Sequence, residues 1–216
     1  MIDKRVLSAM LSESARLLAE QSDTLSEIDS QFGDGDHGIT MLKIAKLIDQ
    51  EVSTWDSASQ ADFLDSLGMK AMEVRGGSAG PLYGTLIGGL GFDLSEDEQV
   101  LDTAAVQRMF AGCLSEMQDI TTATIGDKTM MDALIPACEA VAAASAADDV
   151  GVVLDAAADA AEKGAKASEQ FVSKFGRAKS YKEATIGTPD AGAISTSLFI
   201  RGLAQGYHKA TLAKSS

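Results

Sequence analysis

The sequence predicts an all-α protein, an antiparallel bundle or barrel of eight helices that forms a single domain over residues 1–216. Apolar residues recur at the three- and four-residue spacing of helices almost everywhere, and the alternation typical of a half-buried strand is absent. The chain is long enough for a substantial core, and no stretch rich in proline, glycine or serine divides it. No repeat of solenoid length is visible, so we expect neighbouring helices to pack side by side.

The first four expected helices are each marked by an apolar stripe. The stripes consist of Val6, Leu7, Met10, Leu11, Leu17 and Leu18; of Ile39, Leu42, Ala45 and Ile48; of Phe63, Leu64, Leu67 and Met72; and of Leu82, Leu86 and Leu90. Pro81 opens the fourth helix, because proline fits the first turn, where its missing amide hydrogen costs nothing.

The last four helices follow the same pattern. The fifth and sixth stripes consist of Val106, Met109, Phe110, Cys113, Leu114 and Met117, and of Met131, Leu134, Ile135, Cys138 and Val141. Asp127 is expected to cap the sixth helix, and Pro136 within it predicts a kink. The seventh runs from about residue 150 to 171 and is rich in alanine, which favours helix and allows close packing. Asp190 is expected to cap the eighth, which carries Ile194, Leu198, Leu203 and Ala204.

The composition excludes several classes of partner. Lys and Arg number 18 against 32 Asp and Glu, a formal net charge of −14. Nucleic acids and anionic membrane surfaces need a basic face, so neither is an expected partner. No apolar run approaches the roughly 18 residues of a membrane span, and the N-terminus lacks the apolar core of a signal peptide. With only Cys113 and Cys138 as cysteines, a disulfide framework is not expected, and we predict a cytoplasmic protein.

Three loops are candidates for function: residues 29–38, 75–81 and 174–192. In the first, Gly33-Asp34-Gly35-Asp36-His37-Gly38 fits the dinucleotide-binding pattern G-x-G-x-x-G, but no strand precedes it, so we reject that interpretation. A calcium EF-hand also fails, because Ile39 and Ala45 stand where glycine and glutamate are required. The spacing of Asp29, Asp34 and Asp36 leaves two alternatives open: a Mg²⁺ or Ca²⁺ site, or a solvated acidic loop in which Asp36 caps the next helix.

The neighbouring residues favour a bound nucleotide. The helix that starts at residues 37–40 and the glycines at 76–80 both offer backbone amides to phosphates, although the glycines also suit a tight turn. Residues 126–130 look more like a helix cap than a phosphate clamp. The third loop carries Lys174, Arg177, Lys179 and Lys182, a local basic excess that a polyphosphate needs in so acidic a protein. Together these loops predict a nucleotide bound through metal.

Four blocks, in a fixed order, carry a family resemblance. They are Asp29 with Gly-Asp-Gly-Asp-His-Gly at 33–38, Gly-Gly-Ser-Ala-Gly-Pro-Leu-Tyr-Gly-Thr at 76–85, Gly-Asp-Lys-Thr-Met at 126–130, and Gly-Arg-Ala-Lys-Ser-Tyr with the later Ile-Gly-Thr-Pro-Asp-Ala-Gly at 176–192. On these blocks the chain resembles, over essentially its full length, the L (nucleotide-binding) subunit of dihydroxyacetone kinases. Ala191 departs from the pattern, because family members often have proline there.

The resemblance implies an eight-helix antiparallel up-and-down barrel with the nucleotide site at one rim. It implies that Asp29, Asp34 and Asp36 hold two Mg²⁺ ions bridging the phosphates of ATP or ADP. It also implies two sets of nucleotide contacts. The phosphates would meet His37, Gly38, Ile39, Thr40, Ser78 and Ala79, and the rest of the nucleotide would be surrounded by Thr121, Met130, Arg177, Asp190, Ala191 and Gly192.

The implied activity is phosphoryl transfer from Mg-bound ATP to dihydroxyacetone, or a related short ketose, held by a separate K subunit. Arg177 is our candidate for neutralising transition-state charge. The sequence does not decide between free exchange of ATP and a bound ADP that a sugar-phosphotransferase protein rephosphorylates. It leaves the exact ketose and a homodimer open. Two other functions also remain open: a module that regulates another protein by its ADP or ATP state, and a carrier of apolar molecules.

Overall fold

The computed structural model describes residues 1–56 and 58–213, and within them it is helical. The α-helices are α1 (Lys4–Glu20), α2 (Ser22–Ser30), α3 (His37–Thr54), α4 (Gln60–Met72), α5 (Ala79–Phe92), α6 (Thr103–Ile120), α7 (Met131–Ala142), α8 (Val150–Ala167) and α9 (Ala191–Leu212). Two 3₁₀ segments, η1 (Ser168–Gln170) and η2 (Arg177–Thr185), lie between α8 and α9. The described residues contain no strand, only one antiparallel bridge in which Ile2 and Leu101 exchange backbone hydrogen bonds of 2.8 Å.

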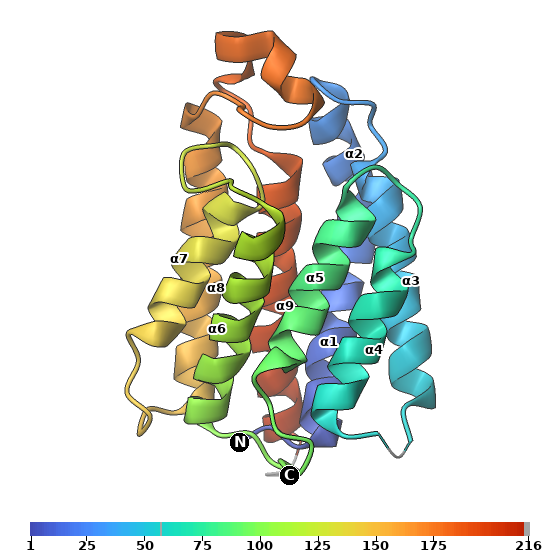
Figure 1. Ribbon diagram of the computed structural model, residues 1–216, viewed down its shortest axis with the longest axis vertical. Helices are drawn as coiled ribbons and strands as arrows, with labels where there is room; N and C mark the ends of the chain where they lie inside the picture. The colour runs from blue at the N-terminus through green and yellow to red at the C-terminus, as the bar shows by residue number, and fades with distance from the viewer. Residues whose placement is uncertain (57, 214–216) are drawn as a thin grey trace.

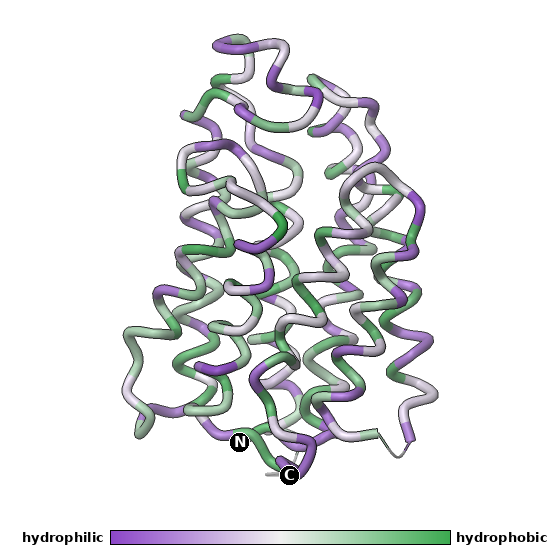
Figure 2. Tube along the Cα trace, viewed as in Figure 1, coloured by the Kyte–Doolittle hydropathy of each residue, from purple (hydrophilic) through white to green (hydrophobic). Residues whose placement is uncertain are grey.

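Eight of these helices form a closed ring, which confirms the predicted all-α fold. Each of α3 to α8 packs beside the next helix in sequence, α1 packs beside α3, and the extensive contact between α1 and α9 closes the ring. Both termini lie at one end of the long axis, and the 3₁₀ segments cover the other (Figure 1). Figure 2 shows hydrophobic residues recurring along every helix of the barrel. No helix in the described part of the chain combines the length and apolar character needed to span a bilayer.

The helix starts follow local sequence signals. The side chains of Asp3, Ser59, Asp102, Asp149 and Asp190 each accept a hydrogen bond from an amide in the first turn of the helix that follows. Such caps satisfy amides that have no partner within the helix. The predicted cap at Asp190 is therefore confirmed.

Close approach of the helices depends on small residues. A Cβ on Gly202 of α9 would lie 2.2 Å from Ser14 Cα of α1, and one on Gly164 of α8 would lie 2.0 Å from Asp132 O. Both distances are far below ordinary van der Waals contact, so only glycine permits these helix pairs to pack as they do. On α8 the buried face is largely alanine, as the sequence predicts: Ala157, Ala158, Ala161 and Ala165.

The structure corrects three details of the sequence prediction. The short helix α2 was not expected, because Leu25 is its one buried residue and leaves no apolar stripe. The predicted cap at Asp127 is wrong: α7 starts at Met131, and the Asp127 carboxylate instead accepts from the amide of Thr124 at 2.9 Å. The seventh expected helix ends at Ala167 rather than near residue 171 and continues only as the 3₁₀ turn η1. Pro136 lies inside α7, which continues past it to Ala142.

Candidate functional site

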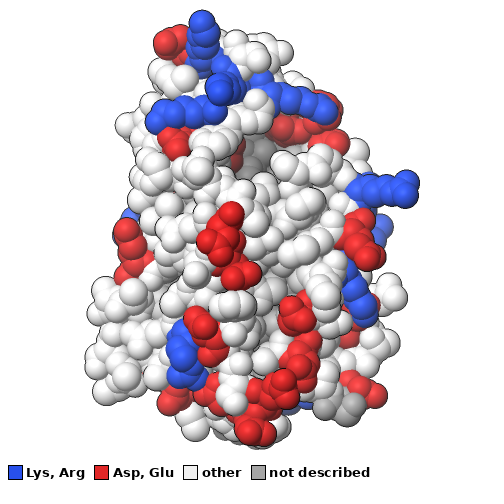
Figure 3. All heavy atoms as spheres, in the orientation of Figure 1, with Lys and Arg blue, Asp and Glu red and all other residues white. Residues whose placement is uncertain are grey.

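A cavity of about 310 Å³ lies at the end of the barrel away from the termini. Its walls come from the α2–α3 loop, the glycine loop before α5, the α6–α7 connection, residues 173–178 and the start of α9 with the residues just before it. In Figure 3 the surface is hollowed at this end, below a group of Lys and Arg side chains. Exposed cations of residues 174–182 supply this positive charge: Lys174, Arg177, Lys179 and Lys182.

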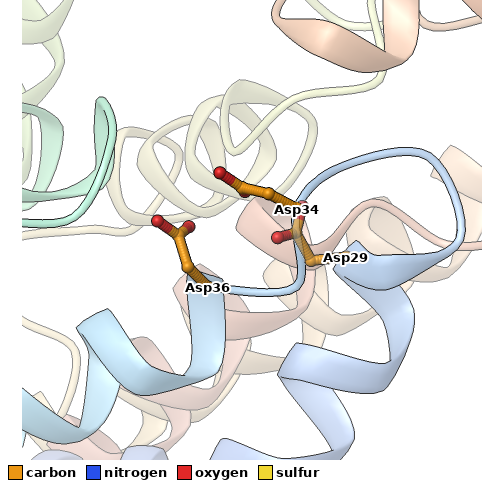
Figure 4. A group of neighbouring side chains, drawn as sticks. All are labelled: Asp29, Asp34 and Asp36. Atoms are coloured by element: carbon orange, nitrogen blue, oxygen red, sulfur yellow. The ribbon is translucent and has the colours of Figure 1, made fainter.

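Asp29, Asp34 and Asp36 converge on one wall of this cavity. One carboxylate oxygen from each lies within 4.8 Å of the others, and Figure 4 shows the three side chains pointing to the same side of the loop. Glycines make this turn possible: Gly35 has φ +73°, and a Cβ on Gly33 would lie 2.3 Å from Asp29 Oδ1. Three hard oxygen donors so close repel one another and suit a divalent cation such as Mg²⁺. Asp36 stands at the N-cap of α3 but its side chain makes no cap hydrogen bond, so the capping alternative is not supported.

His37 connects this acidic loop to α9. Its backbone amide donates to Asp29 Oδ2 at 3.4 Å, and its ring Nε2 lies 2.8 Å from Ser195 Oγ. The Ser195 hydroxyl donates to Gly192 O at 3.1 Å, which leaves its oxygen free to accept from a protonated Nε2. Burial lowers the pKa of His37, so the ring is neutral near pH 7 and orients the start of α3 without adding charge.

The three residues after His37 do not line the cavity with their side chains. A Cβ on Gly38 would lie 1.7 Å from Ser22 O, so glycine is needed for α3 to pack on α2. Ile39 is exposed, whereas Thr40 is buried and its hydroxyl donates to Asp36 O at 3.1 Å. Thr40 also lies behind the glycine loop, because a Cβ on Gly76 would lie 1.8 Å from its Oγ1. It supports that loop from outside the cavity.

The glycine loop forms the wall beside the acidic loop. Gly76, Gly77, Ser78 and Ala79 all line the cavity. Gly77 has φ +54°, a backbone angle that favours glycine. A Cβ there would meet nothing within 4 Å, so the main chain at Gly77 is not covered by neighbouring atoms. Ser78 precedes α5 and makes no side-chain cap bond, so the first amides of α5 are available to an anion.

Residues 169–187, which we call the cap segment, extend over the cavity mouth. Arg177 forms an ion pair with Asp34, and the Phe32 and Tyr181 rings lie 5.1 Å apart, so the cap segment meets the acidic loop at two points. Gly176 (φ +61°) and Lys182 (φ +50°) turn the chain sharply on either side of Tyr181. Arg177 thereby reaches Asp34, one of the carboxylates that could hold metal.

The start of α9 closes the far wall, where Met130, Asp190, Ala191 and Gly192 all line the cavity. The Asp190 carboxylate accepts from the amide of Ala193 at 2.8 Å, while the surrounding protein desolvates it and raises its pKa to about 7. Thr121 does not belong to this lining. It ends α6, and its hydroxyl accepts from the amide of Ala123 at 3.1 Å.

The cavity also contains residues that the sequence did not identify. They include Phe32, Tyr83, Lys128, Thr129, Ser173 and Phe175. Lys128 is the most unexpected, because it is only 4% exposed and has a left-handed backbone, φ +59°. In the sequence it stands within Gly-Asp-Lys-Thr-Met, a block that carries the family resemblance but that by itself looks like a helix cap, so no role was predicted for the lysine.

Comparison with known proteins identifies a family for this chain. Residues 31–205 match the DAK2 domain family model. The chain is 32% identical over 203 residues to D-erythrulose kinase of Mycolicibacterium smegmatis, covering 93% of this chain but 35% of that protein. It is 29% identical over 213 residues to the ADP-binding subunit DhaL of the PEP-dependent dihydroxyacetone kinase 2 of Listeria innocua, covering 97% of both chains.

A solved structure shares the fold. The dihydroxyacetone kinase of C. freundii in complex with AMP-PNP and Mg²⁺ superimposes with a TM-score of 0.68 at 25% identity, over 92% of this chain and 33% of that one. The chain therefore spans about a third of the larger kinases that it matches, and nearly the whole of the separate subunit.

Proposed function

Because the chain belongs to the DAK2 domain family, we propose that it is the nucleotide-binding subunit of a kinase for dihydroxyacetone or a related short ketose such as erythrulose. The observation that carries this proposal is the convergence of Asp29, Asp34 and Asp36 within 4.8 Å, at the wall of a cavity that two helix N-termini adjoin. The names of the relatives, an ADP-binding subunit and an erythrulose kinase, support both the nucleotide and the class of sugar.

The acidic loop is the proposed magnesium site. Carboxylate oxygens of Asp29, Asp34 and Asp36 would hold two Mg²⁺ ions against the phosphates of ATP or ADP, since Mg²⁺ prefers oxygen ligands and keeps positions open for phosphate. Bound there, the ions would offset the negative charge that phosphoryl transfer spreads over the equatorial oxygens. The AMP-PNP and Mg²⁺ complex of the related C. freundii kinase supports this pairing.

The other walls would position the nucleotide. Backbone amides at Ser78 and Ala79, and those of Gly38 and Ile39 at the start of α3, would face the phosphates, whereas the amides of His37 and Thr40 already donate to Asp29 and Asp36. Met130 and residues 190–192 would flank the rest of the nucleotide. Arg177 would offset charge on the moving phosphoryl group, as its present pairing with an anionic carboxylate suggests.

The acceptor is proposed to come from a K-type partner subunit that holds the sugar. As the sugar hydroxyl oxygen bonds to the γ-phosphorus, the bond from that phosphorus to the β-phosphate oxygen would break, its electron pair would stay on ADP, and the hydroxyl proton would pass to solvent. The PEP-dependent relative supports a route in which bound ADP is rephosphorylated by a sugar-phosphotransferase protein. The rate at which ADP leaves this chain distinguishes that route from exchange with free ATP.

Reconstitution tests the proposal. The chain alone, a K-type partner alone and their mixture are each supplied with Mg-ATP, or with Mg-ADP and a phosphoenolpyruvate-fed donor, and with dihydroxyacetone or erythrulose. We expect sugar phosphate only in the mixture. Rapid multiple turnover by the isolated chain would refute the need for a partner, and Mg-nucleotide binding without turnover in any mixture would instead favour a regulatory module.

A further inference from the structure

Lys128 reaches both ends of the cap segment from a turn outside it. Its ammonium donates to Ser168 O at 2.6 Å and also to Thr188 O, the carbonyls that flank residues 169–187. Two further hydrogen bonds tie these ends together: the amide of Gly187 donates to Glu169 O at 2.7 Å, and the amide of Asp190 donates to Ser168 Oγ at 2.9 Å. The cap segment is thus a compact loop with a closed neck, and one buried ammonium joins the two sides of that neck.

The turn that carries Lys128 is itself rigidly held. The Asp132 carboxylate accepts from the amides of Gly126 at 2.6 Å and Thr129 at 2.7 Å. The neighbouring Asp127 pairs with Lys174 Nζ at 2.5 Å, and its carbonyl accepts from the amide of Lys174 at 3.1 Å. The turn therefore holds the cap segment at two places: Asp127 binds Lys174, and Lys128 binds the carbonyls of Ser168 and Thr188 at the neck.

The cap segment is consequently anchored on two sides of the cavity. The turn of residues 126–129 holds it on the side of α7, and Arg177 and Tyr181 meet the acidic loop on the side of α2 (Figure 1). Without the Lys128 ammonium, only the Gly187–Glu169 and Asp190–Ser168 hydrogen bonds would join the two sides of the neck, and the loop that carries Arg177 would be less constrained.

The chemistry of Lys128 argues against a role in stability alone. A buried ammonium loses its hydration, and burial lowers the pKa of Lys128, while the carboxylates of Asp190, Asp132 and Glu169 oppose that effect. A left-handed backbone angle adds a cost for a non-glycine residue. An apolar side chain would avoid the cost of the buried charge, but it could not bond two carbonyls at once.

We propose that Lys128 is a positioning residue, whose ammonium closes the neck of the cap segment and thereby holds Arg177 over the Asp29, Asp34 and Asp36 carboxylates. This inference rests on the proposed function for its consequence, because an open neck should release Mg-nucleotide faster. The closed neck itself is a property of the free chain and can be tested without any ligand.

The test compares Lys128→Met with the wild type by amide hydrogen exchange in the free chain. We expect peptides from residues 169–187 to exchange at least about tenfold faster in the variant, with α1 and α9 unchanged. Lys46→Met, which removes an exposed lysine from α3, is the matched control. It should leave the exchange of residues 169–187 and of α1 and α9 unchanged. Lys128→Gln keeps a polar group in the buried site but is too short to reach both carbonyls. Residues 169–187 must also lose protection from hydrogen exchange in this variant, and it replaces Lys128→Met if that variant does not fold.

A second measurement follows the release of fluorescent Mg-ADP. We expect release to be about tenfold faster from Lys128→Met and unchanged in Lys46→Met. Uniformly faster exchange throughout the barrel, or unchanged exchange in the cap segment, would overturn the inference. If the wild type binds no Mg-ADP, the proposed function fails, and the exchange experiment still decides whether Lys128 closes the neck.

Discussion

The guanidinium of Arg177 pairs with the carboxylate of Asp34 across the mouth of the cavity. The two side chains are 67% and 41% exposed, so water and salt screen their attraction and the pair contributes little to stability. Its significance is therefore positional: it places the cation of the cap segment beside the group of carboxylates proposed to hold metal.

We expect Arg177→Met to reduce phosphoryl transfer in the reconstituted kinase by about 10³-fold, since an arginine that stabilises transition-state charge contributes on that order. The free energy of unfolding should change by less than about 0.5 kcal/mol, because the side chain is exposed. Lys179→Met, which removes another exposed cation from the cap segment, is the control. Equal turnover numbers for the two variants would exclude a special role for Arg177.

Asp34→Asn and Asp36→Asn should each abolish most of the rise in melting temperature given by Mg-ADP. Each variant keeps the shape of the side chain but loses one ligand charge, so metal and nucleotide bind more weakly and stabilise less by linkage. Without ligand, the melting temperature should stay the same or rise as repulsion is relieved. Asp23→Asn, on the exposed surface of α2, should behave as wild type. If Mg-ADP raised the melting temperature of both site variants as much as that of the wild type, the proposed metal site would be contradicted.

Mg²⁺ and ADP should also bind cooperatively to the wild type, because each screens the repulsion that the other meets at the carboxylates. Calorimetric titration of ADP with and without Mg²⁺ measures this directly. We expect a higher affinity for ADP when Mg²⁺ is present, and equal affinities would contradict the shared site.

Asp190 should make stability depend on pH in the direction opposite to most carboxylates. Its pKa rises from 3.8 to about 7 in the folded chain, so between these values the folded state keeps a proton that the unfolded state releases. Stability contributed by this group is therefore lost as pH rises from about 4 to about 7. Asp190→Asn keeps an acceptor for the cap but cannot titrate.

Urea unfolding from pH 4 to pH 8 checks this prediction. The stability of wild type relative to Asp190→Asn should fall over that range and level off above pH 7. Taking the difference cancels the titration of groups that the two proteins share, such as Glu13, whose pKa is lowered by Arg16. A stability difference that stays constant with pH would mean that the pKa of Asp190 is not raised in the folded chain.

Gly202→Ala should destabilise the barrel by about 1–3 kcal/mol, because the added methyl would overlap the backbone of Ser14 and force α1 and α9 apart. Gly88→Ala is a matched control on α5, since its Cβ would meet nothing closer than Gly68 Cα at 3.7 Å. That variant should be neutral or more stable by up to about 1 kcal/mol, the helix preference of alanine over glycine. Chemical denaturation measures the free energy of unfolding of both variants. The same Gly→Ala change then reports steric overlap at Gly202 and helix preference at Gly88.

The barrel helices could be predicted because each buries one face, and a buried face leaves its period in the sequence. Helix α2 buries only Leu25 and left no such period. The grouping of carboxylates in the acidic loop could also be predicted, since its aspartates and glycines are neighbours in the chain. Thr40 and Thr121 were expected at the nucleotide, yet neither lines the cavity, because tertiary packing decides which way a side chain turns. Lys128 was overlooked for the same reason, as its acceptors lie far away in sequence.

The contact between α1 and α9 has a consequence for how the chain reaches its native state. Helices α3 to α9 each pack on a helix that neighbours them in sequence, but the ring closes only when the first and last helices, α1 and α9, meet. Joining such distant segments carries the largest loop-closure entropy in the molecule, so we expect this seam to form late in folding. Until it forms, the apolar stripe of α1 has no cover on that side, and self-association during refolding should begin there.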